Sequence, residues 1–384
     1  MKVTIQKSEF IQAIKAMRLV ADRSSNKPIL ANCHLNVSKG SGTFTGTDLQ
    51  TTIIFPVTCK PVEPGGVAVF NVETVWKARE TFKGDSVTLE TDDGQRVKIG
   101  NLSLPMIEPG LYPTATDTID PRQRYVIRTD DFKRIVSETL FACQKNETRR
   151  NLMGLHLDPA NSWLQVTTTD GHRLAQTKAA IETGKDNADH ILPRAGAAIV
   201  CKVLEIAKAK PDVLVTSHYD AKTAIYRFHD IVIHSRLVED KFPNVASNIP
   251  KDNPSKLTVD RVQLMGALKI IAAMSTDKIK PVGVAINAGS MVLGSEPGEN
   301  GVAREAIPIR YDGEPITIVF NAVYLLDVLR ISKADCVTLG FDGSLNPLLV
   351  TFPNNPCFQG VVMPLRIFWN SNDAGTLPES TIGE

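Results

Sequence analysis

The amino-acid sequence repeats one pattern three times, and this repetition constrains the fold more than any other feature. Each copy opens with a short strand-like segment and continues into a helix whose apolar residues recur at a 3.6-residue period. The strand-like segments are residues 3–5, 125–127 and 256–258. Measured from Val3, Val126 and Leu257, the copies lie 123 and 131 residues apart. A period of about 125 residues is the size of a small domain and much longer than a solenoid repeat, so we expect three copies of one domain.

Further landmarks recur in the same order in each copy. A hydroxyl residue is followed by an acidic residue at Thr47-Asp48, Thr169-Asp170 and Ser295-Glu296. A second helix follows the pairs Phe70-Asn71, Leu192-Pro193 and Phe320-Asn321. These landmarks predict domains at residues 1–123, 124–254 and 255–368. We expect residues 369–384 to form a disordered tail, because this segment is polar and rich in Gly, Pro and Ser.

The order of elements within each copy predicts the fold class. Each copy is expected to contain a strand, a helix, several strands, a second helix and several further strands. Two helices that cover antiparallel sheets make an α+β domain. The predicted helices span residues 8–23, 72–83, 130–145, 194–209, 260–275 and 322–333.

The composition excludes several classes of protein. Hydrophobic residues make up 42% and charged residues 22%, as in ordinary globular proteins. No apolar run approaches the ~18 residues of a membrane span, and the first residues lack the apolar core of a signal peptide. The six cysteines are scattered without a Cys-x-x-Cys pair, which predicts reduced thiols, a cytoplasmic location and no metal site.

The net charge of +1 conceals an uneven distribution of charge. The six predicted helices hold 16 Lys or Arg against 10 Asp or Glu, whereas the remainder holds 27 against 32. A helical surface of net charge +6 on a nearly neutral protein is typical of polyanion binding. The alternative is a set of solvated amphipathic helices, because Lys and Arg are good helix formers.

Several short motifs point to one family. The motifs are Pro28-Ile29-Leu30, Gly46-Thr47-Asp48-Leu49, Thr169-Asp170-Gly171-His172-Arg173-Leu174, Phe242-Pro243, Phe320-Asn321 with Tyr324, and Val362-Met363-Pro364-Leu365-Arg366-Ile367. On these residues the chain resembles the bacterial DNA polymerase III beta subunits, the sliding clamps, from residue 1 to about residue 367. The resemblance implies a head-to-tail homodimer that forms a six-domain ring with helices inside and sheets outside. It also implies sequence-independent contact with duplex DNA, no catalytic activity, no cofactor and no membrane association. The implied partners are DNA polymerase III alpha, other polymerases and the clamp loader.

The resemblance also implies three groups of site residues. A hydrophobic pocket for client peptides would contain Leu152, Thr169, Gly171, His172, Arg173, Leu174, Pro243, Asn321, Tyr324, Val362, Met363, Pro364, Leu365 and Arg366. Contacts with DNA would involve Arg23, Lys27, Lys77, Lys145, Asn146, Arg149, Arg150, Arg194 and Lys202. The subunit interface would set Leu102 and Leu104, on an edge strand, against Ala273 and Met274 at the end of a helix. If the pocket is correct, client side chains should insert against Leu174, Pro243, Val362 and Met363.

Other interpretations stay open from the sequence. Asp170 and His172 could form an acid–base pair in a nucleotide-acting enzyme, a structural turn, or a wall of the pocket. No nucleophile motif, phosphate loop or His-x-x-x-His pair accompanies them. The loop at residues 144–150 is either a DNA contact or a solvated basic loop. A peptide-binding scaffold of the same fold that does not bind DNA is the remaining alternative.

Overall fold

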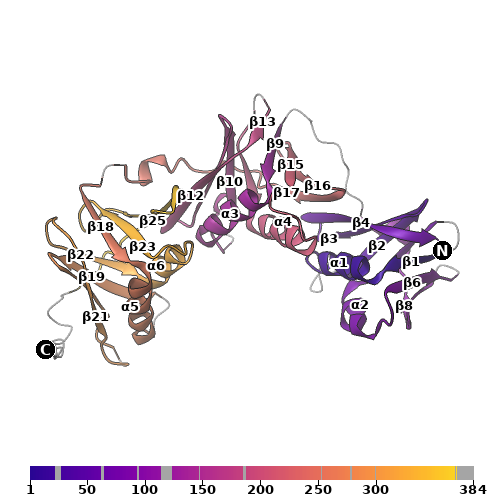
Figure 1. Ribbon diagram of the computed structural model, residues 1–384, viewed down its shortest axis with the longest axis horizontal. Coiled ribbons are helices and arrows are strands. Elements are labelled where there is room, and N and C mark those ends of the chain that lie inside the picture. The colour runs from indigo at the N-terminus through magenta and orange to yellow at the C-terminus, as the bar shows by residue number, and fades with distance from the viewer. Residues whose placement is uncertain are drawn as a thin grey trace. The chain divides into compact units, whose positions relative to one another are not determined.

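The computed structural model divides into two compact units, which we call unit 1 and unit 2 (Figure 1). Unit 1 comprises Met1–Val136, His156–Leu164 and Ala179–Asp240, and unit 2 comprises Ser137–Leu155, Gln165–Lys178 and Lys241–Glu384. The structure describes residues 1–21, 27–61, 65–92, 95–113, 123–146, 148–184, 187–251, 253–276, 279–298, 300–367 and 369. The division passes through the second repeat, so the domain boundaries expected from the sequence stay a prediction.

Unit 1 is built on one long antiparallel sheet. Its strands follow the order β13-β9-β15-β16-β17-β4-β1-β6-β7-β8, and β3, β2 and β5 continue from β4. Their bounds are β1 (Lys2–Gln6), β2 (Asn32–Ser38), β3 (Ser41–Thr47), β4 (Thr51–Pro61), β5 (Gly66–Asn71), β6 (Ser86–Thr91), β7 (Arg96–Ile99), β8 (Leu102–Pro105), β9 (Arg124–Arg128), β13 (Glu182–Thr183), β15 (Leu214–Tyr219), β16 (Thr223–Phe228) and β17 (Ile231–Arg236). Helices α1 (Lys7–Met17), α2 (Val72–Ala78) and α4 (Arg194–Ile206) cover the sheet, and α1 packs against both of the others. Strand β14 (His190–Pro193) leads into α4.

Unit 2 contains two antiparallel sheets and two helices. One contributes the order β12-β25-β24-β23-β18, which is part of an eight-stranded sheet, and the other has the order β21-β20-β19-β22. The bounds are β12 (Arg173–Ala180), β18 (Ser255–Asp260), β19 (Pro281–Asn287), β20 (Ser290–Gly294), β21 (Arg304–Pro308), β22 (Ile316–Asn321), β23 (Cys336–Phe341), β24 (Leu348–Phe352) and β25 (Asn355–Val362). Helices α5 (Arg261–Met274) and α6 (Ala322–Leu329) bury their apolar faces against these sheets. Helix α3 (Thr129–Thr139) and strands β10 (Gly154–Ala160), β11 (Trp163–Thr169) and β12 carry residues of both units.

The predicted α+β fold is confirmed, and all six predicted helices are present. Each helix ends earlier than its periodicity suggested, and two of them pass directly into tighter turns. Helix α2 passes into a 3-10 turn at Arg79–Thr81, and α3 passes into one at Leu140–Ala142. In the turn after α3, Ala142 is still buried, although the i to i+4 hydrogen bonds of the α-helix have ended.

Several expectations about individual segments can now be compared with the structure. The described residues contain no helix long and apolar enough to cross a membrane. All six cysteines are free. Trp369, expected to begin a disordered tail, is buried against the outer face of β19, β20 and β22. The rest of that expected tail, residues 370–384, lies outside the described residues.

Candidate functional site

A tight turn between β11 and β12 forms the centre of the candidate site in unit 2. The Thr169 hydroxyl donates to the Arg173 carbonyl (2.7 Å) and accepts from the Gly171 N–H (3.1 Å). Asp170 Oδ1 accepts from the backbone N–H groups of His172 (3.0 Å) and Arg173 (3.1 Å). Gly171 has a φ of +89°, a left-handed conformation that glycine adopts without a steric penalty. The turn is therefore fixed by its own side chains.

Arg173 carries the turn into the interior of unit 2. Its side chain is only 5% exposed, and Nε donates to Asp170 Oδ2 (3.0 Å). Nη1 donates to Asp327 Oδ2 on α6 (2.6 Å), and Nη2 donates to the Phe141 carbonyl (2.9 Å). A buried charge with this many partners holds elements together and is not free for a ligand. Both Asp170 oxygens are committed to the turn and to Arg173, which speaks against an acid–base role.

Aromatic rings cover one side of this arginine. The Arg173 guanidinium lies 4.5 Å from the centre of the Tyr324 ring, within the range of a cation–π interaction. The ring of His172 stacks on Tyr324 at 6.1 Å and 22°. Asn321 caps α6 by accepting from the Val323 N–H (3.0 Å), which fixes the start of the helix that carries Tyr324. Burial raises the pKa of the Tyr324 phenol, so the hydroxyl stays protonated at neutral pH.

The C-terminal segment lies beside the turn. In the β12–β25 pair, Arg173 is opposite Val362 and Leu174 is opposite Val361. Beyond β25, the Met363 N–H donates to the His172 carbonyl (2.8 Å). The two predicted segments, residues 169–174 and 362–367, therefore lie side by side. We call the surface formed by His172, Tyr324 and residues 363–366 the groove.

The predicted client contacts differ in how far they reach the surface. Val362 is fully buried and Leu174 is 4% exposed, because β25 runs between β12 and β24 and both side chains pack into the interior. The expectation that a client inserts against these two residues stays a prediction, with both side chains beneath the surface in this conformation. Met363, at 38%, and Pro243 are exposed. Leu152 is buried in the 3-10 turn Arg150–Leu152.

The sequence did not predict three features of the site. Asp327 and Phe141 hold Arg173, although neither belonged to the predicted pocket. Asp327 could have been found as the only acidic residue of the predicted helix at residues 322–333. Arg149, predicted as a DNA contact, lies beside the groove turn, since a Cβ added at Gly171 would lie 3.3 Å from its Nη1 atom.

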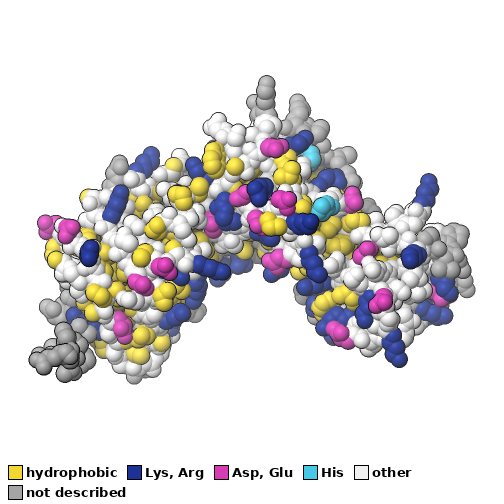
Figure 2. Space-filling view, in the orientation of Figure 1, with side chains coloured by type: hydrophobic (Ala, Val, Ile, Leu, Met, Phe, Trp, Pro, Cys, Tyr) yellow, Lys and Arg dark blue, Asp and Glu magenta, His cyan; other side chains and the backbone are white. Residues whose placement is uncertain are grey.

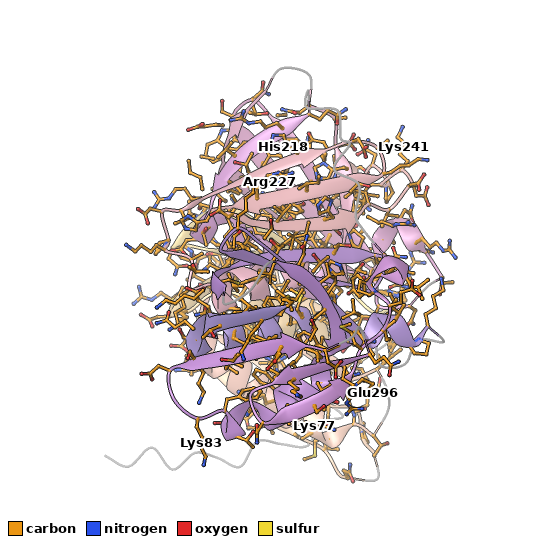
Figure 3. The ribbon with its side chains drawn as sticks, turned by 90° about the vertical axis from the view of Figure 1, so that its right-hand side faces the viewer. Lys77, Lys83, His218, Arg227, Lys241 and Glu296 are labelled. Atoms are coloured by element: carbon orange, nitrogen blue, oxygen red, sulfur yellow. The ribbon has the colours of Figure 1, made fainter. Side chains whose placement is uncertain are left out.

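The predicted DNA-contacting residues are exposed where the structure describes them. Exposed side chains belong to Lys27, Lys77, Lys145, Asn146, Arg149, Arg150, Arg194 and Lys202, whereas Arg23 lies outside the described residues. Figure 2 shows Lys and Arg side chains along the helical side of each unit, with acidic side chains between them. Figure 3 shows Lys77 on α2 and Lys83 beyond the end of that helix. Lys202 pairs with Glu205 at 2.9 Å, and this partner raises its pKa.

The predicted interface residues lie at element ends. Strand β8 is the edge of the unit 1 sheet, as expected, and Leu102 and Leu104 on it are half-buried. In unit 2, Ala273 is exposed and Met274 is half-buried at the end of α5.

Among the residues that the structure describes, no group of three or more His, Cys, Asp or Glu side chains could hold a metal ion. An apolar cavity of about 20 Å³ lies in the core of unit 2, lined by residues such as Leu264, Met291 and Phe320. It is a packing defect roughly the size of one water molecule and is separate from the groove.

Three family models match successive parts of the chain. The N-terminal, central and C-terminal domains of the DNA polymerase III beta subunit match residues 1–116, 126–244 and 246–366. The beta sliding clamp of Caulobacter vibrioides is 29% identical over 379 residues, covering 96% of this chain and all of that protein. The beta sliding clamp of Pseudomonas putida is 28% identical over 381 residues with the same coverage.

Solved structures give the same result. The Caulobacter crescentus pol III beta structure is 28% identical with a TM-score of 0.87, covering 96% of this chain and all of its own. The Pseudomonas aeruginosa sliding clamp bound to griselimycin has the same fold, with a TM-score of 0.89, 24% identity and the same coverage.

Proposed function

Because this chain belongs to the DNA polymerase III beta subunit family, we propose that its groove is the place where it holds the polymerase. A member of this family is a sliding clamp, a processivity factor without catalytic activity. It is a homodimer that encircles duplex DNA and binds DNA polymerase and the clamp loader. The proposal concerns which residues of this chain carry these roles.

One observation carries the assignment of the groove. The turn at residues 169–173 and the segment after β25 are joined by the hydrogen bond from Met363 to His172, and Tyr324 stacks on that histidine. Exposed Met363 and the aromatic rings provide an adaptable apolar surface beside polar backbone groups, which suits the capture of an extended apolar peptide. Leu152, Thr169, Leu174, Asn321 and Val362 support the groove from below, while Pro243, Pro364, Leu365 and Arg366 are proposed to extend it.

The test compares two exposed apolar residues of unit 2. We expect Met363→Glu to weaken binding of the purified polymerase alpha subunit at least about tenfold, because a charge would enter the apolar contact. Leu345, 68% exposed in the turn after β23, is the matched control. Leu345→Glu should change the dissociation constant less than about twofold. Equal weakening by both variants, or by neither, would reject the groove.

Duplex DNA is proposed to contact the basic residues of the helices and of the loop before β10. Neutralising Arg149 and Arg150 together should weaken DNA binding equally for all sequences. The slope of log affinity against log salt should fall by roughly 0.9 for each phosphate that the variant no longer binds. The control combines Lys39→Gln with Lys98→Gln. Lys39 lies in the turn between β2 and β3, and Lys98 lies on β7. A changed base preference with an unchanged salt slope would contradict phosphate contact.

The subunit interface is proposed to join the edge of β8 to the end of α5. Leu104→Asp or Met274→Asp would bury a charge in this contact at a cost of several kcal/mol. Monomers at micromolar concentration, seen by light scattering, are the expected result, with Leu345→Asp as the dimeric control. Dimers in both interface variants would refute this assignment.

The free thiols of the chain accord with a cytoplasmic location, which we also propose.

A further inference from the structure

The outer face of the four-stranded sheet in unit 2 is unusual for a sheet face that points away from the core. Along β19, the side chains of Val282, Val284 and Ile286 enter the core of unit 2. The alternate positions, Gly283 and Ala285, point to the opposite face, as the period-two geometry of a strand requires. Val292 and Gly294 on β20 and Val319 on β22 share that face. An outer face is ordinarily polar, so these small apolar residues indicate that something covers it.

Trp369 provides the cover. Its side chain is 8% exposed and packs with Ala285, Val292 and Val319. A Cβ added at Gly283 or Gly294 would overlap the indole ring, and in both cases the three nearest atoms belong to that ring. The two glycines therefore form a hollow that the indole fills and that any larger residue would close. We call it the glycine hollow.

The segment that leads to Trp369 is also the wall of the groove. Met363 is bonded to His172, as described above, and the Leu365 N–H donates to the Val319 carbonyl at 2.7 Å. Leu365 packs against the cluster that holds the indole. Within the described residues, the C-terminal segment is thus attached at three points, of which Trp369 is the last. A strand end attached only at its start would fray, since terminal residues open easily unless they are tied down.

We propose that Trp369, seated in the glycine hollow, is a positioning residue that holds Met363 to Arg366 in the conformation that receives client proteins. The inference rests on the proposed function of the groove. The family match ends at residue 366, so Trp369 lies outside the part of the chain that the family models describe. The hollow is an aromatic-binding site that this chain fills with its own side chain.

The experiment uses the full-length chain and ejects the indole in two independent ways. Trp369→Ala empties the hollow, whereas Gly283→Ala combined with Gly294→Ala closes it. Hydrogen–deuterium exchange of residues 363–367, read by mass spectrometry, should accelerate about tenfold in both variants, because the last attachment point is gone. The exchange of β23 is the internal reference. The affinity for the purified polymerase alpha subunit should fall at least about threefold. Trp369→Phe should recover most of both effects, since a smaller ring still fits the hollow.

Combining the two kinds of variant sharpens the test. If both act through the same contact, adding Trp369→Ala to the closed hollow should have no further effect on exchange or affinity. Unchanged exchange of residues 363–367 in Trp369→Ala would overturn the proposal, and so would faster exchange with unchanged affinity. Met363→Glu, measured in parallel, reports on the groove itself. If that variant binds normally, the groove assignment fails, while the exchange data still decide whether Trp369 holds the segment.

Discussion

The first and second repeats contain the same turn, and only the second turn belongs to the groove that we propose as the client site. In the first repeat, Thr47 donates to the Thr51 carbonyl (3.2 Å) and accepts from the Leu49 N–H (3.0 Å). Asp48 Oδ1 accepts from the N–H groups of Gln50 (2.9 Å) and Thr51 (2.6 Å). Every one of these bonds has its counterpart in the turn from Thr169 to Arg173. The hydrogen-bonding pattern is therefore a structural frame and carries no function by itself.

The two turns differ in the residues that the frame presents. The left-handed position is Leu49, with a φ of +70°, in the first turn and Gly171 in the second. The last residue is buried Thr51 in the first turn, whereas in the second it is Arg173, whose guanidinium extends to Asp327. The same backbone frame therefore joins a second element where its last residue is an arginine that reaches α6.

The largest expected difference in stability comes from shortening the last residue of each turn. Arg173→Ala would leave Asp170, Asp327 and the Phe141 carbonyl without their buried partner, at a cost of about 3–5 kcal/mol to unit 2. Thr51→Ala should cost unit 1 only about 1 kcal/mol. Native-state hydrogen exchange in α6 and in β4 measures the two effects. Similar costs would mean that the arginine does no more than the threonine.

Acid should affect the stability of the two units that contain these turns differently. His190 in unit 1 is buried, with its ring 4.0 Å from that of Tyr219, and burial lowers its pKa to about 3. In the unfolded chain this histidine takes up a proton near its ordinary pKa of about 6.5, so the stability of unit 1 is complete above that pH. It should fall by about 1.4 kcal/mol per pH unit below that point, or about 2 kcal/mol by pH 5.

Hydrogen exchange of unit 1 at pH 7 and pH 5, corrected for intrinsic rates, measures this decrease in stability. His190→Gln should remove this part of the pH dependence, because glutamine does not titrate. An equally steep decrease in the glutamine variant would exclude His190 as the cause.

Replacing the turn aspartates by asparagine tests the charge separately from the frame. Asparagine keeps the oxygen that accepts the two backbone N–H groups. Asp170→Asn also weakens the bond to Arg173 Nε, so we expect a destabilisation of about 1.5 kcal/mol. Asp48→Asn should cost about 0.5 kcal/mol or less. Thermal unfolding of the two variants, monitored by hydrogen exchange in each unit, measures both costs. A larger destabilisation by Asp48→Asn than by Asp170→Asn would contradict the comparison.

The smallest expected effects concern the left-handed position. Gly171→Ala forces a Cβ into a conformation that costs about 1 kcal/mol and brings it against Arg149. Leu49→Gly removes that strain but also removes the packing of a half-buried side chain, so the net change should stay within about 0.5 kcal/mol. Polymerase binding by the alanine variant, compared with its stability, shows whether the strain reaches the groove. A stabilised Gly171→Ala protein would contradict the assigned conformation.

Much of the fold could be predicted from the periodicity of the sequence. Most of the features that the sequence did not predict depend on contacts between residues far apart along the chain. The repeat and the helical periods predicted all six helices. They could not reveal that Arg173 meets Asp327, because that contact joins residues 154 positions apart. The polar composition around Trp369 suggested disorder, since the hollow that holds the indole is supplied by two distant glycines. Val362 was expected to face a client, and only the order of strands in the sheet explains its burial.

The glycine hollow also fixes an order in which this contact could have arisen by mutation. A tryptophan acquired at position 369 while either position 283 or 294 carried a side chain would have found no room on the sheet. On a path that gains the glycines first, each glycine destabilises its strand by roughly 0.5–1 kcal/mol relative to alanine. On that path the stabilising contact is gained only when the indole arrives. Reversal is hindered as well, because any side chain regained at either glycine must displace the ring.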